Sequence, residues 1–105
     1  MEIKFEKKYL QELYELGKTT DKKYRFQPDI VKRYQSRIET LESAERIEEL
    51  FAINSLHYEV LKGNKEGISS IRVNNKYRIE FTITEVVSEI VVTICNIIEL
   101  SNHYQ

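Results

Sequence analysis

The sequence predicts an α+β fold, with helices in its first half and an antiparallel sheet in its second half. Apolar residues recur every three or four positions over residues 7 to 51, which is typical of amphipathic helices. Beyond residue 56 the apolar residues alternate every second position, as in strands with one buried face. Helices that precede a meander of strands indicate segregated α and β layers.

The helical half is expected to begin with a strand and to contain three helices. In chain order we expect a strand over residues 2 to 6, a helix over 7 to 16, a loop over 18 to 26, a helix over 28 to 42 and a short helix around 44 to 51. Gly17 is well placed to end the first helix. Pro28 suits the first turn of the second helix, where its missing N–H costs nothing.

The second half is expected to form four strands, over residues 57 to 62, 67 to 74, 77 to 84 and 89 to 99. The separating segments read "GNKEG", "NNK" and "EVVS". The N-terminal strand is expected to join this sheet at an edge or beside the last strand.

Composition bounds the possible functions. A length of 105 residues predicts one domain, residues 1 to 105, and a net charge of -1 predicts no strong attraction of the whole molecule to nucleic acid or membranes. Cys95, the one cysteine, excludes an internal disulfide and suits a reducing compartment; we expect it in the core of the last strand rather than as a nucleophile. Neither a signal peptide nor a membrane span is predicted, so a cytoplasmic location is expected.

The stretch "SIRVNNKYRIEF", residues 70 to 81, reads as a hairpin that carries two arginines. A two-residue turn would set apolar residues opposite charged ones, whereas a three-residue loop at 74 to 76 matches apolar with apolar. The expected pairs are Val73 with Tyr77, Ile71 with Ile79, Ser69 with Phe81 and Arg72 with Arg78. Asn74 and Asn75 are expected to provide the left-handed conformation that this loop requires.

Two interpretations of the facing arginines remain open from the residues alone. A carboxylate such as Glu80 or Glu59 could neutralise the pair, because like charges that face each other on a sheet are destabilising. Alternatively the two guanidinium groups form a phosphate site, which Lys62 and Lys65 would extend. Between residues 57 and 78 there are five Lys or Arg against two Glu, so this region is locally basic.

The same region resembles a known family of toxins. The segment "LKGNKEGISSIRVNNKYRIEF", a long apolar strand and the ending "ELSNHYQ" are similar to the HigB branch of the RelE/ParE toxin superfamily. The likeness is close over residues 56 to 105, and the helical half agrees in layout. It implies a RelE-like fold, with the N-terminal strand and two to three helices packed on one face of the antiparallel sheet.

The resemblance also implies an activity and its partners. It implies the toxin of a type II toxin-antitoxin system: a metal-independent endoribonuclease that cleaves mRNA on the ribosome and inhibits translation. The partner would be a HigA-like helix-turn-helix antitoxin, with operon DNA bound only through it. The toxin alone would be monomeric, without cofactor or metal.

RNA cleavage through the 2′-hydroxyl needs a base, an acid and a cation that stabilises the transition state. By resemblance the catalytic residues are Lys62, Arg78, His103 and Tyr104. The residues expected to bind RNA or phosphate are Arg72, Lys65, Lys76, His57 and Asn102. Simpler alternatives stay open: Lys62 and His57 as surface side chains, and His103 and Tyr104 as a frayed end, with Tyr104 otherwise able to stack on a base.

The chain departs from the family pattern at two positions. The best-known members of the family end in the order Asp-Tyr-His, whereas this chain has Asn102, His103 and Tyr104, so the terminal carboxylate is missing unless Glu99 serves. Some members carry a histidine three residues before the LKG lysine, where this chain has Glu59.

Contact with ribosomal RNA would have to come from local basic patches. Lys22, Lys23 and Arg25 are expected to supply it, with Lys32, Arg33 and Arg37 as either a second patch or the solvated face of a helix. A ParE-like inhibitor of DNA gyrase without nuclease activity, or a degenerate toxin that only binds its antitoxin, are the alternative functions.

Overall fold

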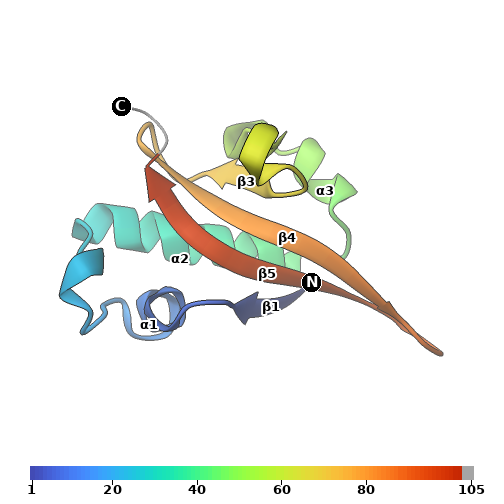
Figure 1. Ribbon diagram of the computed structural model, residues 1–105, viewed down its shortest axis with the longest axis horizontal. Coiled ribbons are helices and arrows are strands. Elements are labelled where there is room, and N and C mark those ends of the chain that lie inside the picture. The colour runs from blue at the N-terminus through green and yellow to red at the C-terminus, as the bar shows by residue number, and fades with distance from the viewer. Residues whose placement is uncertain (103–105) are drawn as a thin grey trace.

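The computed structural model describes residues 1–102 and confirms the α+β prediction, with helices on one face of a five-stranded sheet (Figure 1). The strands are β1 (Glu2–Phe5), β2 (Glu59–Val60), β3 (Ser69–Arg72), β4 (Tyr77–Val87) and β5 (Val91–Asn102). The α-helices are α1 (Lys8–Leu16), α2 (Pro28–Ser43) and α3 (Glu48–Phe51). Three short 3-10 helices are η1 (Lys22–Tyr24), η2 (Asn54–Leu56) and η3 (Gly63–Lys65).

The strand order is β1-β5-β4-β3-β2. Strands β2 to β5 form an antiparallel meander, and β1 is added at the edge parallel to β5, with Ile3 opposite Cys95. The expectation that the first strand lies at an edge beside the last strand is therefore confirmed. The parallel pair makes the sheet mixed rather than purely antiparallel.

The core lies between the helices and one face of the sheet. Tyr34 of α2 is fully buried, and its hydroxyl donates a hydrogen bond to the Leu10 carbonyl at 2.7 Å, which ties α2 to α1. From the sheet, Phe81 and Ile97 are fully buried against these helices. Cys95 is also buried, and burial raises the pKa of its thiol to about 12, so the prediction of a core cysteine is confirmed.

Both predicted helix signals act as expected. Gly17 has φ +75°, a left-handed conformation that glycine adopts without steric cost, and its N–H donates to the Leu13 carbonyl at 3.1 Å. Pro28 occupies the first turn of α2. No helix among residues 1–102 is long and apolar enough to cross a membrane.

Several predicted boundaries are wrong. The expected loop over 18 to 26 contains η1, because the Asp21 side chain accepts a hydrogen bond from the Lys23 N–H at 3.1 Å and starts a turn. The expected strand over 57 to 62 shrinks to β2, because η2 and the left-handed backbone of His57 (φ +45°) precede it. The third helix is limited to Glu48–Phe51.

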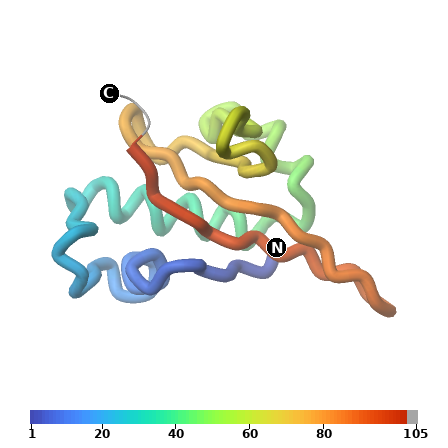
Figure 2. Tube along the Cα trace, viewed as in Figure 1, coloured from blue at the N-terminus to red at the C-terminus, as the bar shows by residue number. Residues whose placement is uncertain are grey.

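The last hairpin is longer than predicted. Strand β4 continues to Val87 and β5 extends to Asn102, so only residues 88 to 90 are left as a turn. Strand β3 pairs with β4 only as far as Phe81, and β1 pairs with β5 only from Ile94 onward. Residues 85–93 therefore pair only with each other among residues 1–102, starting with Glu85 opposite Thr93, and they project from the body as a two-stranded ribbon that we call the arm (Figures 1 and 2).

Candidate RNA-phosphate site

The hairpin of β3 and β4 has the predicted three-residue register. The Val73 N–H donates to the Tyr77 carbonyl at 2.9 Å, and Arg72 lies directly opposite Arg78. The expected left-handed asparagines are not found, because His57 is the only residue other than glycine with positive φ among residues 1–102. Instead the Asn74 side-chain oxygen accepts hydrogen bonds from the N–H groups of Lys76 and Tyr77 at 2.9 and 2.8 Å, and closes the loop.

Arg78 is held in a fixed orientation within the sheet. Its side chain is only 2% exposed. The Nε donates to the Ser70 hydroxyl at 2.9 Å, and Nη2 donates to the Ser70 carbonyl at 3.3 Å and to the His57 carbonyl. The remaining nitrogen, Nη1, has no hydrogen-bond partner among residues 1–102, so it is the donor that remains for a ligand.

His57 approaches Arg78 through its main chain. It ends η2, where its left-handed conformation turns its carbonyl oxygen toward the guanidinium group. Histidine tolerates this conformation better than bulkier or β-branched residues do. His57 therefore lies in a turn and not in the strand predicted over residues 57 to 62, and it contacts Arg78 from that turn.

A pocket of about 340 Å³ opens over Arg78 and contains both signs of charge. Its walls are His57, Glu59, Arg72, Asn75 and Arg78. We call this the arginine pocket. It places an imidazole and a carboxylate next to two guanidinium groups, which is a chemically complete set for binding a phosphate and moving a proton.

The structure bears on both interpretations of the arginine pair, neutralisation by a carboxylate and a phosphate site extended by lysines. Within residues 1–102 neither Arg72 nor Arg78 makes an ion pair with a carboxylate. The buried Glu80 instead pairs with Lys65, whose Nζ lies 3.2 and 2.9 Å from the two carboxylate oxygens. Lys65, predicted to bind phosphate, is thus engaged by Glu80.

Basic residues continue from the arginine pocket into a second pocket of about 590 Å³, whose walls include Arg33, Arg72, Asn75 and Lys76. Arg72 and Asn75 line both pockets, and the Arg72 guanidinium donates to the Asn75 side-chain oxygen. Arg37 adds to the cluster, because its Nε donates to the Arg72 carbonyl at 2.9 Å. Burial and the charges of Arg33 and Arg72 lower the pKa of Arg37, as expected among clustered cations.

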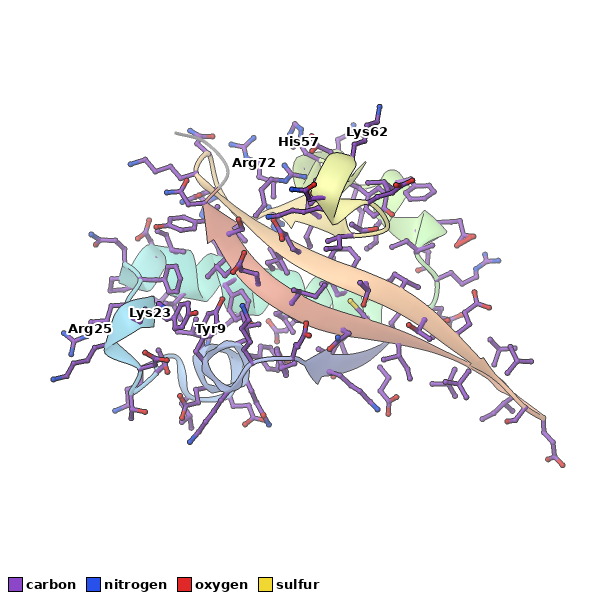
Figure 3. All side chains as sticks on the ribbon, in the orientation of Figure 1. Tyr9, Lys23, Arg25, His57, Lys62 and Arg72 are labelled. Atoms are coloured by element: carbon purple, nitrogen blue, oxygen red, sulfur yellow. The ribbon has the colours of Figure 1, made fainter. Side chains whose placement is uncertain are left out.

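Other predicted residues lie apart from the arginine pocket. Lys62 is exposed just before η3 and points away from the body (Figure 3). Lys22, Lys23 and Arg25 are exposed on and after η1, and line neither pocket. Lys23 and Arg25 are labelled in Figure 3. Lys23 lies over the Tyr24 ring, with its Nζ 5.9 Å from the ring centroid.

The predicted polar tail is described only in part. Asn102 lies opposite Tyr77, one register position from the pair of Arg78 and Ser101. His103 and Tyr104 lie outside the described residues, so their roles stay predictions.

Glu59 was predicted only as a carboxylate that could neutralise the arginine pair, and not as a catalytic or RNA-binding residue. It is exposed at the start of β2 and lines the arginine pocket. A signal for it existed, because Glu59 stands three residues before Lys62, where some members of the resembling family carry an ionisable histidine.

Comparison with known proteins identifies the family. A family model described as the RelE-like toxin of the type II toxin-antitoxin system HigB matches residues 3–94. The chain belongs to this family. It is also 34% identical over 82 residues to Toxin HigB-1 of Vibrio cholerae serotype O1 (strain ATCC 39315 / El Tor Inaba N16961), an alignment that covers 77% of this chain and 82% of that protein.

A solved structure agrees with the fold of this HigB-like toxin. The YoeB/ParE toxin from Agrobacterium tumefaciens superposes with a TM-score of 0.61 at 20% sequence identity, covering 99% of this chain and all of that one. The expected RelE-like fold is therefore confirmed.

Proposed function

We propose that this HigB-like toxin is an endoribonuclease that cleaves mRNA on the ribosome without a metal cofactor and thereby inhibits translation. The observation that carries the proposal is the arginine pocket, where a locked cation, Arg78, faces the same space as a carboxylate and an imidazole. A protein with a net charge of -1 has no strong general attraction for RNA, so its binding of RNA would depend on a local basic cluster of this kind.

The reaction that suits the pocket is transfer of the scissile phosphate to the adjacent 2′-hydroxyl. A base removes the 2′-hydroxyl proton, the 2′-oxygen bonds to phosphorus, and the bond from phosphorus to the 5′-oxygen breaks as an acid protonates that oxygen. The products are a 2′,3′-cyclic phosphate and a 5′-hydroxyl. Charge accumulates on the phosphoryl oxygens in the transition state, where a fixed guanidinium donor stabilises it most.

Arg78 is assigned to this stabilisation. Its Nε and Nη2 bonds prevent the guanidinium from rotating, so little reorganisation is needed when charge develops. Arg72 is assigned to phosphate positioning, because it lines the pocket from the opposite strand.

Glu59 and His57 are the two candidates for the base. Both line the arginine pocket, and histidine and glutamate side chains are common general bases in enzymes. Glu59 is the stronger candidate for a structural reason. The main chain of His57 is held in a left-handed conformation by η2 and accepts a hydrogen bond from Arg78, whereas Glu59 lies on strand β2.

His103 and Tyr104 are proposed as the acid and as a base-stacking residue. The argument is their place in the chain, directly after Asn102, which lies one register position from the partner of Arg78. Lys62, exposed near this edge of the sheet, is proposed to contact RNA phosphate rather than the reacting atoms.

The second pocket gives a path for the RNA that flanks the cleaved bond. Arg33, Arg72 and Lys76 line it, and it shares Arg72 with the arginine pocket, so adjacent phosphates of one strand can contact both. Lys22, Lys23 and Arg25 are proposed to contact the ribosome, because they form an exposed basic segment away from both pockets.

The remaining features of the proposal follow the family. The toxin acts in the cytoplasm as a monomer of one domain, residues 1 to 105. A HigA-like helix-turn-helix antitoxin neutralises it and provides the contact with operon DNA.

The proposal is tested by incubating the purified toxin with mRNA-programmed ribosomes and mapping the cuts by primer extension, with and without EDTA. Glu59→Gln keeps the shape of the side chain and removes its basicity, so we expect at least a hundredfold slower cleavage, within the usual contribution of a general base. Glu66→Gln is the matched control, since it changes a nearby exposed carboxylate outside the pocket. Wild-type cutting by Glu59→Gln would remove Glu59 from the mechanism.

The same preparation distinguishes the alternative functions. Inhibition of gyrase on supercoiled DNA, with no cuts in mRNA, would establish a ParE-like inhibitor and overturn the proposal. A wild-type protein that binds antitoxin but is inactive in both assays would be a degenerate toxin.

A further inference from the structure

We propose that the arm, residues 85–93, is a docking site for the antitoxin, which adds an apolar and basic segment as a further strand along the arm. This inference rests on the proposed function for the identity of the partner. It concerns a surface that shares no residue with the arginine pocket.

The arm exposes apolar side chains that the fold does not need. Every residue from 84 to 91 is exposed. The large apolar side chains among them are Val86 (49% exposed), Val87 (71%), Ile90 (69%) and Val91 (59%). Single exposed apolar residues are ordinary, but four on one short hairpin are not. Val87 pairs with Val91 on one face of the arm, and Val86 lies on the other face opposite Val92, so each face carries part of an apolar patch of the kind that marks protein contacts.

The backbone of the arm is also open to a further strand. On the side of β3, β4 has no ladder partner beyond Phe81 among residues 1–102, and on the side of β1, β5 has none before Ile94. Unpaired N–H and C=O groups on an edge strand are a template for an added strand from another chain.

Beside the arm, a groove of about 630 Å³ continues toward the body of the protein. Its walls include three carboxylates, Glu2, Glu45 and Glu85, and one basic side chain, Arg46, together with Met1 and its ammonium group. Val91 and Val92 from the arm line the same groove, so apolar and acidic surfaces meet there. An occupant that fits both is a segment in which apolar residues are accompanied by Lys or Arg.

Charge decides between an antitoxin segment and a second copy of the toxin. Residues 85–93 contain Glu85 and Glu89 and no Lys or Arg, so pairing of two arms would bring four carboxylates together. Like charges on neighbouring strands destabilise such a pair, and charged edges are a known means of preventing self-association. A basic segment of a different protein has the complementary charge.

Titration calorimetry of the toxin with the antitoxin encoded beside its gene tests the inference. The variant Val87→Lys/Ile90→Lys places two cations on the apolar patch, and we expect its Kd to rise at least about tenfold, as for truncation of a central interface residue. Glu45→Lys/Glu85→Lys should weaken binding too, with a reduced dependence on salt. Leu16→Lys is the matched control, because Leu16 is an apolar residue of α1 with 66% exposure and should leave Kd unchanged.

Each outcome has a defined meaning. An unchanged Kd for both double variants overturns the inference and leaves the proposed function intact, which cleavage of mRNA by the same variants checks separately. If wild-type toxin binds no antitoxin, both the inference and the antitoxin part of the proposed function are wrong. If sedimentation shows that the toxin alone dimerises and Val87→Lys/Ile90→Lys abolishes the dimer, a second copy is the occupant and the inference is overturned.

Discussion

Replacing Ser70 with alanine isolates the contact that orients Arg78. The Ser70 hydroxyl is fully buried and accepts the hydrogen bond from Arg78 Nε at 2.9 Å. Alanine fits the same space, so the variant removes one acceptor from a charged and buried donor without creating a large cavity.

The magnitude follows from the charge of the donor. Hydrogen bonds to charged groups contribute roughly 1.5 to 3 kcal/mol. Because Nη2 keeps its bonds to the Ser70 and His57 carbonyls, we expect the free energy of unfolding to fall by about 2 kcal/mol. A domain of this size has roughly 5 to 15 kcal/mol of stability, so the variant still folds.

The neighbouring serine provides the control. Ser69 is also buried, and its hydroxyl bonds to the Tyr58 hydroxyl at 2.8 Å, a contact between neutral groups. Ser69→Ala should lower the free energy of unfolding by about 1 kcal/mol. Urea unfolding measures both values, with unchanged m-values as the requirement for comparison.

A Ser70→Ala variant that loses no more stability than Ser69→Ala would refute the reasoning, because a charged donor would then be no more dependent on its acceptor than a neutral one. In the mRNA-cleavage assay we expect Ser70→Ala to lose activity and Ser69→Ala to keep it.

Three further outcomes are expected. Gly17→Ala forces alanine into a left-handed conformation and should lower the free energy of unfolding by about 1 kcal/mol, while Gly17→Asn should lower it less; thermal unfolding measures both. Burial raises the pKa values of Cys95 and Tyr9 to about 12 and that of Tyr34 above its usual range, so these groups stabilise the fold below about pH 9. That stability should be lost as the pH rises toward 12, and Cys95→Ser should shift the pH at which circular dichroism first detects unfolding. A fold whose stability does not change as the pH rises to 12 would contradict the burial. His57→Gly removes the imidazole and suits the left-handed backbone, so it should keep or raise the stability while it reduces RNA cleavage. Full cleavage by His57→Gly would restrict His57 to its main-chain contact with Arg78.

The hairpin register could be predicted from the sequence, whereas the surroundings of Arg78 could not. The register depends on which side chains match across two adjacent strands, and that pattern is local. The burial of Arg78 depends on the His57 carbonyl, 21 residues earlier in the chain, and on a left-handed turn that no residue pattern signals. Ion pairs such as Lys65 with Glu80 likewise depend on where loops fold back.

The arm was underestimated because "EVVS" was treated as a connecting segment. Its two valines favour extended backbone, since β-branched side chains fit a pleated strand, and the pairing of Val86 with Val92 and of Val87 with Val91 continues the hairpin. The length of these strands depends on residues on both sides of the turn, so it cannot be predicted from the residues of one strand alone.

The parallel pairing of β1 with β5 has a consequence for synthesis. Strand β1 is made first, yet its only sheet partner among the described residues is Ile94–Ile97, made near the end of the described chain. Contacts between distant parts of a chain form late and slow its folding. While the chain is still being translated, β1 waits without a partner and Arg78 lacks its neighbour Ser101 on β5. The sheet that holds Arg78 is therefore complete only after the last strand, β5, has been made.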